Sequence, residues 1–302
     1  YGVLSRYGLT AMASSLDQVG PIGISAADVA ALLQVMAGSD PLDSTSVPLP
    51  RAESLFPLRP RDWTGQRIGL PREYWGSGLD GGVRSALEAA LAVFERQGAE
   101  LVEVDLPHTR YAIDAYYLVC TSEVSSNLAR FDGVRYGWRT NRPCTSVQDM
   151  VAQTRDQALG PEVKRRILLG TFCLSKGYYE AFYLKALKVR ALLARDFESA
   201  FRKVDVLATP VSPTPAFPLG DKTTDPIAMY LADVFTVTAP LAGLPALALP
   251  AGFSKGLPVG LQLIGPAFSD PALLEAAHRY QLDTSHHLLS PTQPSQEPHH
   301  GL

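Results

Sequence analysis

Polar side chains suited to ligand binding are most concentrated in one short run, residues 125–137 (SSNLARFDGVRYG). The run combines serines and an asparagine with two arginines, an aspartate and two aromatic residues. Its apolar residues follow neither a helical nor a strand period, so the run is typical of a loop shaped for polar recognition. The alternative is an ordinary surface turn in which Asp132 pairs with Arg130 or Arg135.

Three positions outside this run also carry side chains that suit a binding site. Arg165 and Arg166 are neighbours on a predicted helix and lie about 100° apart around its axis, so one can face a pocket while the other faces water. Tyr116 stands beside Tyr117, and a buried tyrosine bonded to backbone is the alternative there. Asp233 follows a short apolar segment near a predicted helix end, where a capping or solvated carboxylate is the alternative. Spacing alone leaves each of these alternatives open.

Motifs that carry catalysis on their own are absent from the sequence. It contains no G-x-S-x-G elbow, no H-E-x-x-H, no C-x-x-C and no phosphate-binding glycine loop. His299 and His300 are adjacent near the end of the chain, but they have no further ligands around them, so we predict no metal site. The sequence therefore offers binding side chains without a recognisable nucleophile and base.

Composition narrows the class of protein. The chain has 302 residues, of which 46% are hydrophobic and 19% charged, and its formal net charge is −3. This balance provides no general field that would attract DNA or an anionic membrane. Three cysteines without paired spacing suit a reducing compartment, so we expect the cytoplasm or an organelle matrix. No apolar run approaches the roughly 20 residues that a membrane-spanning helix requires.

The first half of the chain predicts a helix followed by a parallel crossover. Ser25 and Asp28 have the spacing of a capping box, and the helix that follows is expected to bury Val29, Leu32, Leu33 and Met36 and to stop at Gly38. Residues 67–70 and 101–104 are predicted to be strands. Between them lies a helix, ended by Gly98, whose buried face is expected to contain Val83, Leu87, Leu91 and Phe94.

The second half predicts helices first and then a β-hairpin. Residues 162–203 are helical in pattern, and Gly170 and Gly177 are the weak points, so we expect two helices or a kinked one. A buried strand at 204–208 is followed by a proline-rich loop over 211–218. Strands at 246–249 and 259–264 are expected to pair antiparallel, and a final helix covers about 271–281. Alternating helices and strands indicate an α/β fold.

Several segments resemble known sequences, and their order matters as much as their content. Residues 256–265 (GLPVGLQLIG) and 14–21 (SSLDQVGP) resemble the amidase signature family. Five narrower segments resemble the A subunits of glutamyl/aspartyl-tRNA amidotransferases: 37–46, 115–117, 125–137, 162–167 and 225–233. The resemblance runs from Tyr1 to about Gln281.

The fold implied by this resemblance is the C-terminal part of the amidase signature fold, a mixed β-sheet covered by helices on both faces. It implies that residues 1–289 are the C-terminal portion of a single amidase domain and that residues 290–302 are a flexible tail. The family's Ser–cis-Ser–Lys triad lies before the equivalent of Tyr1, so no catalytic residue is assigned here. We therefore expect this chain by itself to be inactive.

The resemblance also implies roles for the candidate residues. A free amino acid is recognised by a guanidinium at its carboxylate and a carboxylate at its ammonium group. By register with the family, Arg166 would bind the α-carboxylate of glutamine, Asp233 its α-ammonium group, and Tyr116 would add a hydrogen bond. Asp17 would hold the signature loop in place.

The activity implied is that of a glutaminase subunit, which sends ammonia to partner B and C subunits for the amidation of misacylated tRNA. ATP and Mg²⁺ would bind to the B subunit, and this chain would need no cofactor. Two alternatives remain open at this point: an independent amidase of the same family acting on another amide, and a non-catalytic truncated fragment.

Overall fold

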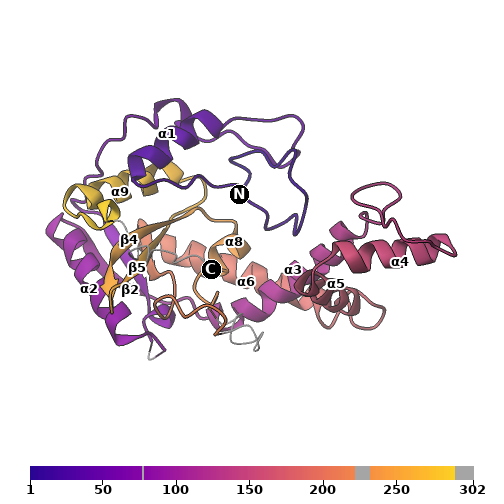
Figure 1. The fold of residues 1–302 in the computed structure, drawn as a ribbon. Coiled ribbons are helices and arrows are strands. Elements are labelled where there is room, and N and C mark those ends of the chain that lie inside the picture. The colour runs from indigo at the N-terminus through magenta and orange to yellow at the C-terminus, as the bar shows by residue number, and fades with distance from the viewer. Residues whose placement is uncertain (77, 222–231, 290–302) are drawn as a thin grey trace, which may run out of the picture.

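A mixed five-stranded β-sheet organises the computed structural model, which describes residues 1–76, 78–221 and 232–289 (Figure 1). The strand order is β2-β1-β3-β5-β4. Strands β2 and β3 run parallel to β1, whereas β5 is antiparallel to both β3 and β4. The strands are β1 (Arg67–Pro71), β2 (Glu100–Val104), β3 (Val206–Pro210), β4 (Ala246–Ser254) and β5 (Leu257–Ile264). The predicted α/β class, parallel crossover and antiparallel hairpin are all confirmed.

Two of the predictions concern residues that lie wholly or mostly outside the described ranges. The tail predicted over residues 290–302 lies outside the described residues, and so does most of the segment 225–233. Only the last two residues of that segment, Ala232 and Asp233, are described.

Burial along the central strands shows that both faces of the sheet are covered. All five residues of β3 are buried, and so is the stretch Leu261–Ile264 of β5. Successive side chains of a strand point to opposite faces, so continuous burial requires packing on each side. The observed β3 starts two residues later than predicted and runs through Pro210, which lies opposite Leu261.

Helices α2 (Gly81–Arg96) and α9 (Asp270–Leu282) pack against β4, and α1 (Ala26–Met36) lies on α9 (Figure 1). The capping box at α1 is present, with Ser25 and Asp28 bonded reciprocally. The prediction for its buried face was partly wrong: Leu33 is buried, but Leu32 and Met36 are each more than 40% exposed. Small residues take the inner face instead, including Ala30, which is fully buried.

Helices α3 (Ala112–Leu128) and α4 (Val147–Ala158), and the arm that contains α4, were not predicted from the sequence. The arm extends from the body (Figure 1). The prediction that residues 125–137 form an irregular loop was therefore wrong for residues 125–128, which are the last turn of α3. Buried Thr121 and Ser122 explain the error, because polar residues on a buried helix face hide its period.

The expected pair of helices after residue 160 is present as α5 (Pro161–Cys173) and α6 (Tyr183–Phe201). The break falls around Gly177, whose φ of 89° suits glycine. Gly170 does not interrupt α5, contrary to prediction. Gly170 instead lies where α5 approaches the backbone of α3 closely, as described below. A short helix, α8 (Thr238–Ala242), precedes β4.

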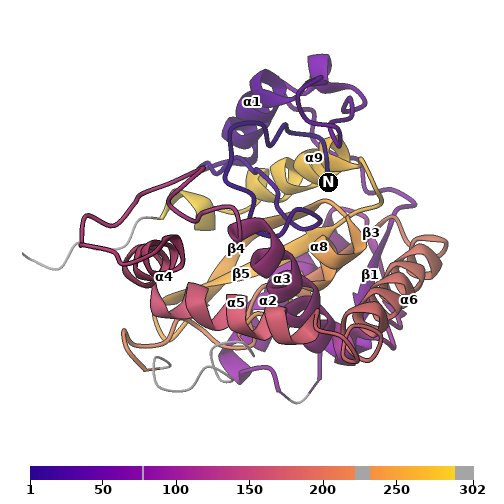
Figure 2. The same cartoon turned by 90° about the vertical axis from the view of Figure 1, so that its right-hand side faces the viewer.

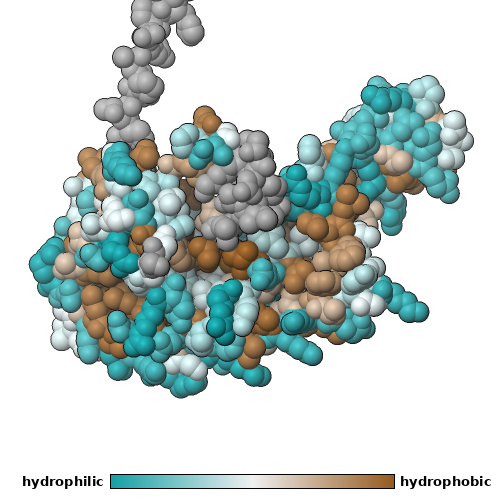
Figure 3. Space-filling view, turned by 90° about the horizontal axis from the view of Figure 1, so that it is seen from below, coloured by the Kyte–Doolittle hydropathy of each residue, from teal (hydrophilic) through white to brown (hydrophobic). Residues whose placement is uncertain are grey.

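Apolar side chains are exposed on the face that Figure 3 presents, including the region between the body and the arm. Large apolar residues exposed in α5 and the turn that follows it are Leu168, Leu169, Phe172 and Tyr178. No helix in the described ranges is both long and apolar enough to cross a lipid bilayer.

Candidate functional site

The packing of α3 against α5 sets the geometry of the candidate site. A Cβ atom built on Gly170 would lie 1.9 Å from the carbonyl oxygen of Thr121, so only glycine permits this approach. One residue further on, the hydroxyls of Thr171 and Ser125 are 2.9 Å apart. Figure 2 shows the two helices side by side. The contact brings the preceding turns of both helices together, because residues four apart share a helix face.

Arg166 lies one turn before Gly170 and faces α3. Its Nη1 is 3.9 Å from the Sγ of Cys120, and its Cζ lies 5.8 Å from the ring centroid of Tyr117. Its Nε donates a 2.9 Å hydrogen bond to Glu162, one turn earlier on α5. The side chain of Arg166 is 22% exposed, whereas that of Arg165 is 47% exposed and turned outward to Glu162. The tertiary structure thus distinguishes the two arginines that spacing could not.

Tyr117 connects the arginine to the acidic candidate. Its hydroxyl donates a hydrogen bond of 3.2 Å to Oδ2 of Asp233. A cation and an anion therefore meet the same aromatic side chain, the cation over the ring and the anion at the hydroxyl. Tyr116 packs edge-on against Tyr117, with ring centroids 5.1 Å apart. We define the binding cluster as Tyr116, Tyr117, Arg166 and Asp233.

Tyr117 is the member that sequence reasoning missed. The two tyrosines are adjacent and chemically identical, so composition gives no reason to prefer either. What separates them is helix phase: Tyr117 lies one turn before Thr121, the residue that meets Gly170. That contact is visible only after α3 and α5 have packed.

The electrostatics keep the tyrosines and the thiol of the site neutral. Burial raises the pKa of Tyr116 to about 12, and burial together with the carboxylate of Asp233 raises the pKa of Tyr117 further. Burial also raises the pKa of the Cys120 thiol, which is inaccessible to solvent. Burial alone would lower the pKa of Arg166, but its hydrogen bond to Glu162 and its other neighbours give a net rise. The cluster therefore offers a permanent cation and neutral hydroxyl donors, not a thiolate nucleophile.

Asp17 lies in a different contact network. Its carboxylate accepts hydrogen bonds from the backbone N–H groups of Met12 and Ala13, at 2.9 and 3.0 Å. Asn127 on α3 donates to the carbonyl of Met12 at 3.1 Å and so ties the same loop to the helix. Asp17 and Asn127 thus hold residues 12–17 of this chain in place.

The rest of the run 125–137 is held by contacts within itself and by Arg155 on α4, which donates to the carbonyls of Leu128 and Phe131 at 2.8 and 3.1 Å. Asp132 pairs with Arg135 at 2.9 Å, as one alternative predicted, and Arg130 donates to the carbonyl of Asn127 at 3.0 Å. These side chains belong to the base of the arm and not to the binding cluster.

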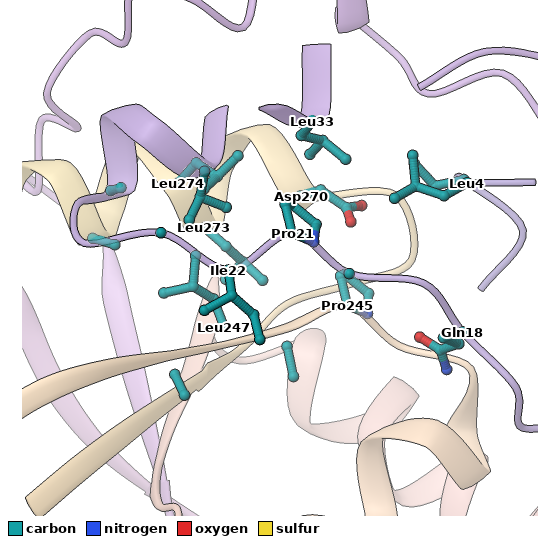
Figure 4. A pocket seen from close by; sticks show the side chains of 18 of the residues that line it. Leu4, Gln18, Pro21, Ile22, Leu33, Pro245, Leu247, Asp270, Leu273 and Leu274 are labelled. Carbon is teal, nitrogen blue, oxygen red and sulfur yellow. The ribbon is translucent and has the colours of Figure 1, made fainter. Parts of the chain in front are cut away.

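A separate cavity of about 630 Å³ lies between the N-terminal segment, the edge strand β4 and α9 (Figure 4). Its apolar lining includes Leu33, Leu247, Leu273 and Leu274, and burial raises the pKa of Asp270 beside them. The charged residues Arg6 and Asp17 also line it. Arg6 pairs with Asp43 at 3.2 Å, and Asp17 is bonded as described above. Because these two charged side chains already have partners within the protein and the rest of the lining is largely apolar, this cavity suits an amino acid less well than the binding cluster does.

Comparison with known proteins identifies the family. The family model described as Amidase matches residues 1–274. The chain belongs to the amidase family. It is 55% identical over 291 residues to the A subunit of glutamyl-tRNA(Gln) amidotransferase from Moorella thermoacetica and 53% identical to that from Chloroflexus aggregans. Each alignment covers 96% of this chain and 59% of the relative, so the chain spans about three fifths of their length.

Solved structures of the amidase family share the fold. The A subunit of glutamyl-tRNA(Gln) amidotransferase from Thermotoga maritima matches with a TM-score of 0.72 and 37% identity, over 92% of this chain and 55% of that one. Native peptide amidase from Stenotrophomonas maltophilia matches with a TM-score of 0.68 and 26% identity, over 94% of this chain and 56% of that one. The predicted resemblance to the amidase family and to its A subunits is confirmed. Within the described residues, no group of three or more potential metal ligands occurs.

Proposed function

We propose that this chain provides the glutamine-binding part of the A subunit of a tRNA-dependent amidotransferase. The observation that carries the proposal is the arrangement around Tyr117, where Arg166 and Asp233 meet one side chain at its ring and at its hydroxyl. Glutamine carries a carboxylate and an ammonium group on one carbon. A fixed guanidinium and a fixed carboxylate separated by one aromatic side chain are complementary to that pair of charges.

In this proposal each residue of the cluster has one task. The terminal nitrogens of Arg166 bind the α-carboxylate, and Glu162 holds the guanidinium by its Nε. Asp233 accepts from the α-ammonium group, and the neutral hydroxyl of Tyr117 orients the carboxylate of Asp233. Tyr116 keeps its proposed hydrogen bond to the substrate, and its ring packs edge-on against that of Tyr117. Asp17 is proposed to hold the signature loop in place through residues 12 and 13, whose backbone N–H groups its carboxylate binds.

The chemistry itself is assigned to groups outside this chain. By the resemblance, the nucleophilic Ser of the Ser–cis-Ser–Lys triad attacks the side-chain amide of glutamine, which releases ammonia and leaves a glutamyl ester that water hydrolyses. The B and C subunits use that ammonia on misacylated tRNA. ATP and Mg²⁺ belong to the B subunit in this proposal. We place the assembly in a reducing compartment, the cytoplasm or an organelle matrix, in keeping with the free thiols of Cys120, Cys144 and Cys173. Relatives at 52–55% identity named as A subunits favour this activity over that of an independent amidase.

The test uses the intact A subunit in complex with its B and C partners. Removing one partner of a charged, partly buried interaction costs about 2–5 kcal/mol, so Arg166→Ala should raise the KM for glutamine by about 100-fold. Amidation driven by added ammonia should be unchanged, because that route bypasses the site. Arg165→Ala is the matched control, since Arg165 is the outward-facing neighbour. Normal glutamine-dependent formation of Gln-tRNA by Arg166→Ala would refute the assignment.

A further inference from the structure

A buried glutamine lies on β5, between β3 and the edge strand β4, where an apolar residue would be expected. Gln262 on β5 is 6% exposed, and its neighbours Leu261 and Leu263 are fully buried. A side-chain amide in such surroundings is costly unless it is hydrogen bonded. Its Nε2 donates to Oγ1 of Thr209 on β3 at 2.9 Å and to the backbone carbonyl of Phe235 at 3.1 Å. The amide therefore links the sheet to a segment outside it, the one that contains Phe235.

That segment is the turn from which Asp233 projects. The backbone N–H groups of Thr236 and Val237 donate to the carbonyl of Asp233 at 3.0 and 3.3 Å. The hydroxyl of Thr236 donates to the same oxygen at 3.1 Å. Phe235 is in the middle of this turn, so holding its carbonyl holds the peptide planes that place Asp233.

Tyr74, which follows β1, makes a second contact that restrains the same turn. The ring of Tyr74 stacks on Phe235 with centroids 5.1 Å apart, and its hydroxyl lies 2.6 Å from that of Thr238. Both Tyr74 and Thr238 are fully buried. Tyr74 thus packs against the middle of the turn and is hydrogen bonded to Thr238 beyond its end. Gln262 provides the hydrogen bond to the backbone in the middle of the turn.

We propose that Gln262 is a positioning residue for Asp233: its amide holds the carbonyl of Phe235 and so fixes the carboxylate that selects the α-ammonium group of the substrate. The inference rests on the proposed function, because Asp233 is assigned to glutamine there. Gln262 itself does not touch the substrate. Its effect is on selectivity for an α-amino group and not on the chemistry of the amide.

The test compares two substrates in the intact A subunit with its partners: glutamine, and glutaramate, which is glutamine without the α-amino group. Gln262→Leu removes the donor and leaves the Phe235 carbonyl without it. It should raise the KM for glutamine about tenfold, with little change in kcat and little change in the KM for glutaramate. General damage to the fold would reduce activity on both substrates alike.

Matched variants make the result specific. Gln97→Leu removes another glutamine whose Nε2 donates to a backbone carbonyl, that of Arg279 at 3.0 Å, and it should leave both KM values unchanged. If Gln262→Leu does not fold, Thr209→Val tests the same link, since it removes the hydroxyl that orients the amide. Thr209→Val should shift the KM for glutamine in the same direction, and Thr209→Ser should restore it.

The following results would overturn the inference. An unchanged KM for glutamine in both Gln262→Leu and Thr209→Val refutes the positioning role, and so does an equal loss on both substrates. Asp233→Asn separates this failure from a failure of the proposed function. If Asp233→Asn loses the preference for glutamine over glutaramate while Gln262→Leu keeps it, only the positioning role is refuted. If Asp233→Asn keeps the preference, the assignment of Asp233 falls and the positioning role falls with it.

Discussion

Gly170→Ala provides a test of the helix contact that shapes the site, because two physical effects predict opposite signs. Alanine is favoured over glycine inside a helix by about 1 kcal/mol. A Cβ at this position, however, would lie 1.9 Å from the carbonyl oxygen and 2.5 Å from the carbonyl carbon of Thr121, and 2.8 Å from Cβ of Ser125. Two of these atoms are backbone, so α3 and α5 must move apart. Overpacking costs up to about 3 kcal/mol, and the net expectation is destabilisation by about 2 kcal/mol.

Urea unfolding of the variant and the parent protein measures this difference directly. Gly81→Ala is the control, because Gly81 lies in the first turn of α2 and has no atom within 4 Å of a built Cβ. The control should be neutral or slightly stabilising. Since the separation of the helices also moves Arg166 from Tyr117, Gly170→Ala should raise the KM for glutamine in the intact enzyme. A Gly170→Ala protein as stable as Gly81→Ala would refute the reasoning, because helix propensity would then outweigh the contact.

Two further predictions concern stability. The hydrogen bond from Arg6, with backbone donors of Arg6 and Thr45, holds the pKa of Asp43 well below its usual range. A lowered pKa in the folded state contributes stability at pH values above the ordinary value of about 4, and this contribution is lost as the pH falls further. Asp43→Asn should therefore be less stable than the parent at pH 7, and the gap between their urea midpoints should narrow toward pH 3; a gap independent of pH would contradict the assignment. At α1, Ser25→Ala removes the hydroxyl that accepts from the backbone N–H of Asp28 and donates to its carboxylate, and it should cost about 1 kcal/mol, while Ser25→Thr should retain most of the stability. Thermal unfolding checks this second prediction, and equal losses in both variants would argue against capping as the cause.

Local patterns predicted those elements whose stability is decided by neighbours in the sequence. The capping box at Ser25, the buried face from Val83 to Phe94 and the hairpin of β4 and β5 all involve residues that lie close together in the sequence. The apolar period is clean in α2, because its inner face meets the core and its outer face meets water. The same reasoning failed for α3, which buries Thr121 and Ser122 between two other helices and so has no simple apolar side.

The sequence by itself determined the fold class, the family and the identity of Arg166 and Asp233 as candidates. The tertiary structure decided which side chains meet. It brought together Asp233 and Tyr117, 116 positions apart in the chain, and it turned Arg166 inward and Arg165 outward. It also made Tyr117 the tyrosine that contacts both charges. The physical reason is that helix phase and the approach of two helices are set by contacts such as Gly170 on Thr121, which join residues distant in the sequence and leave no periodic trace in it.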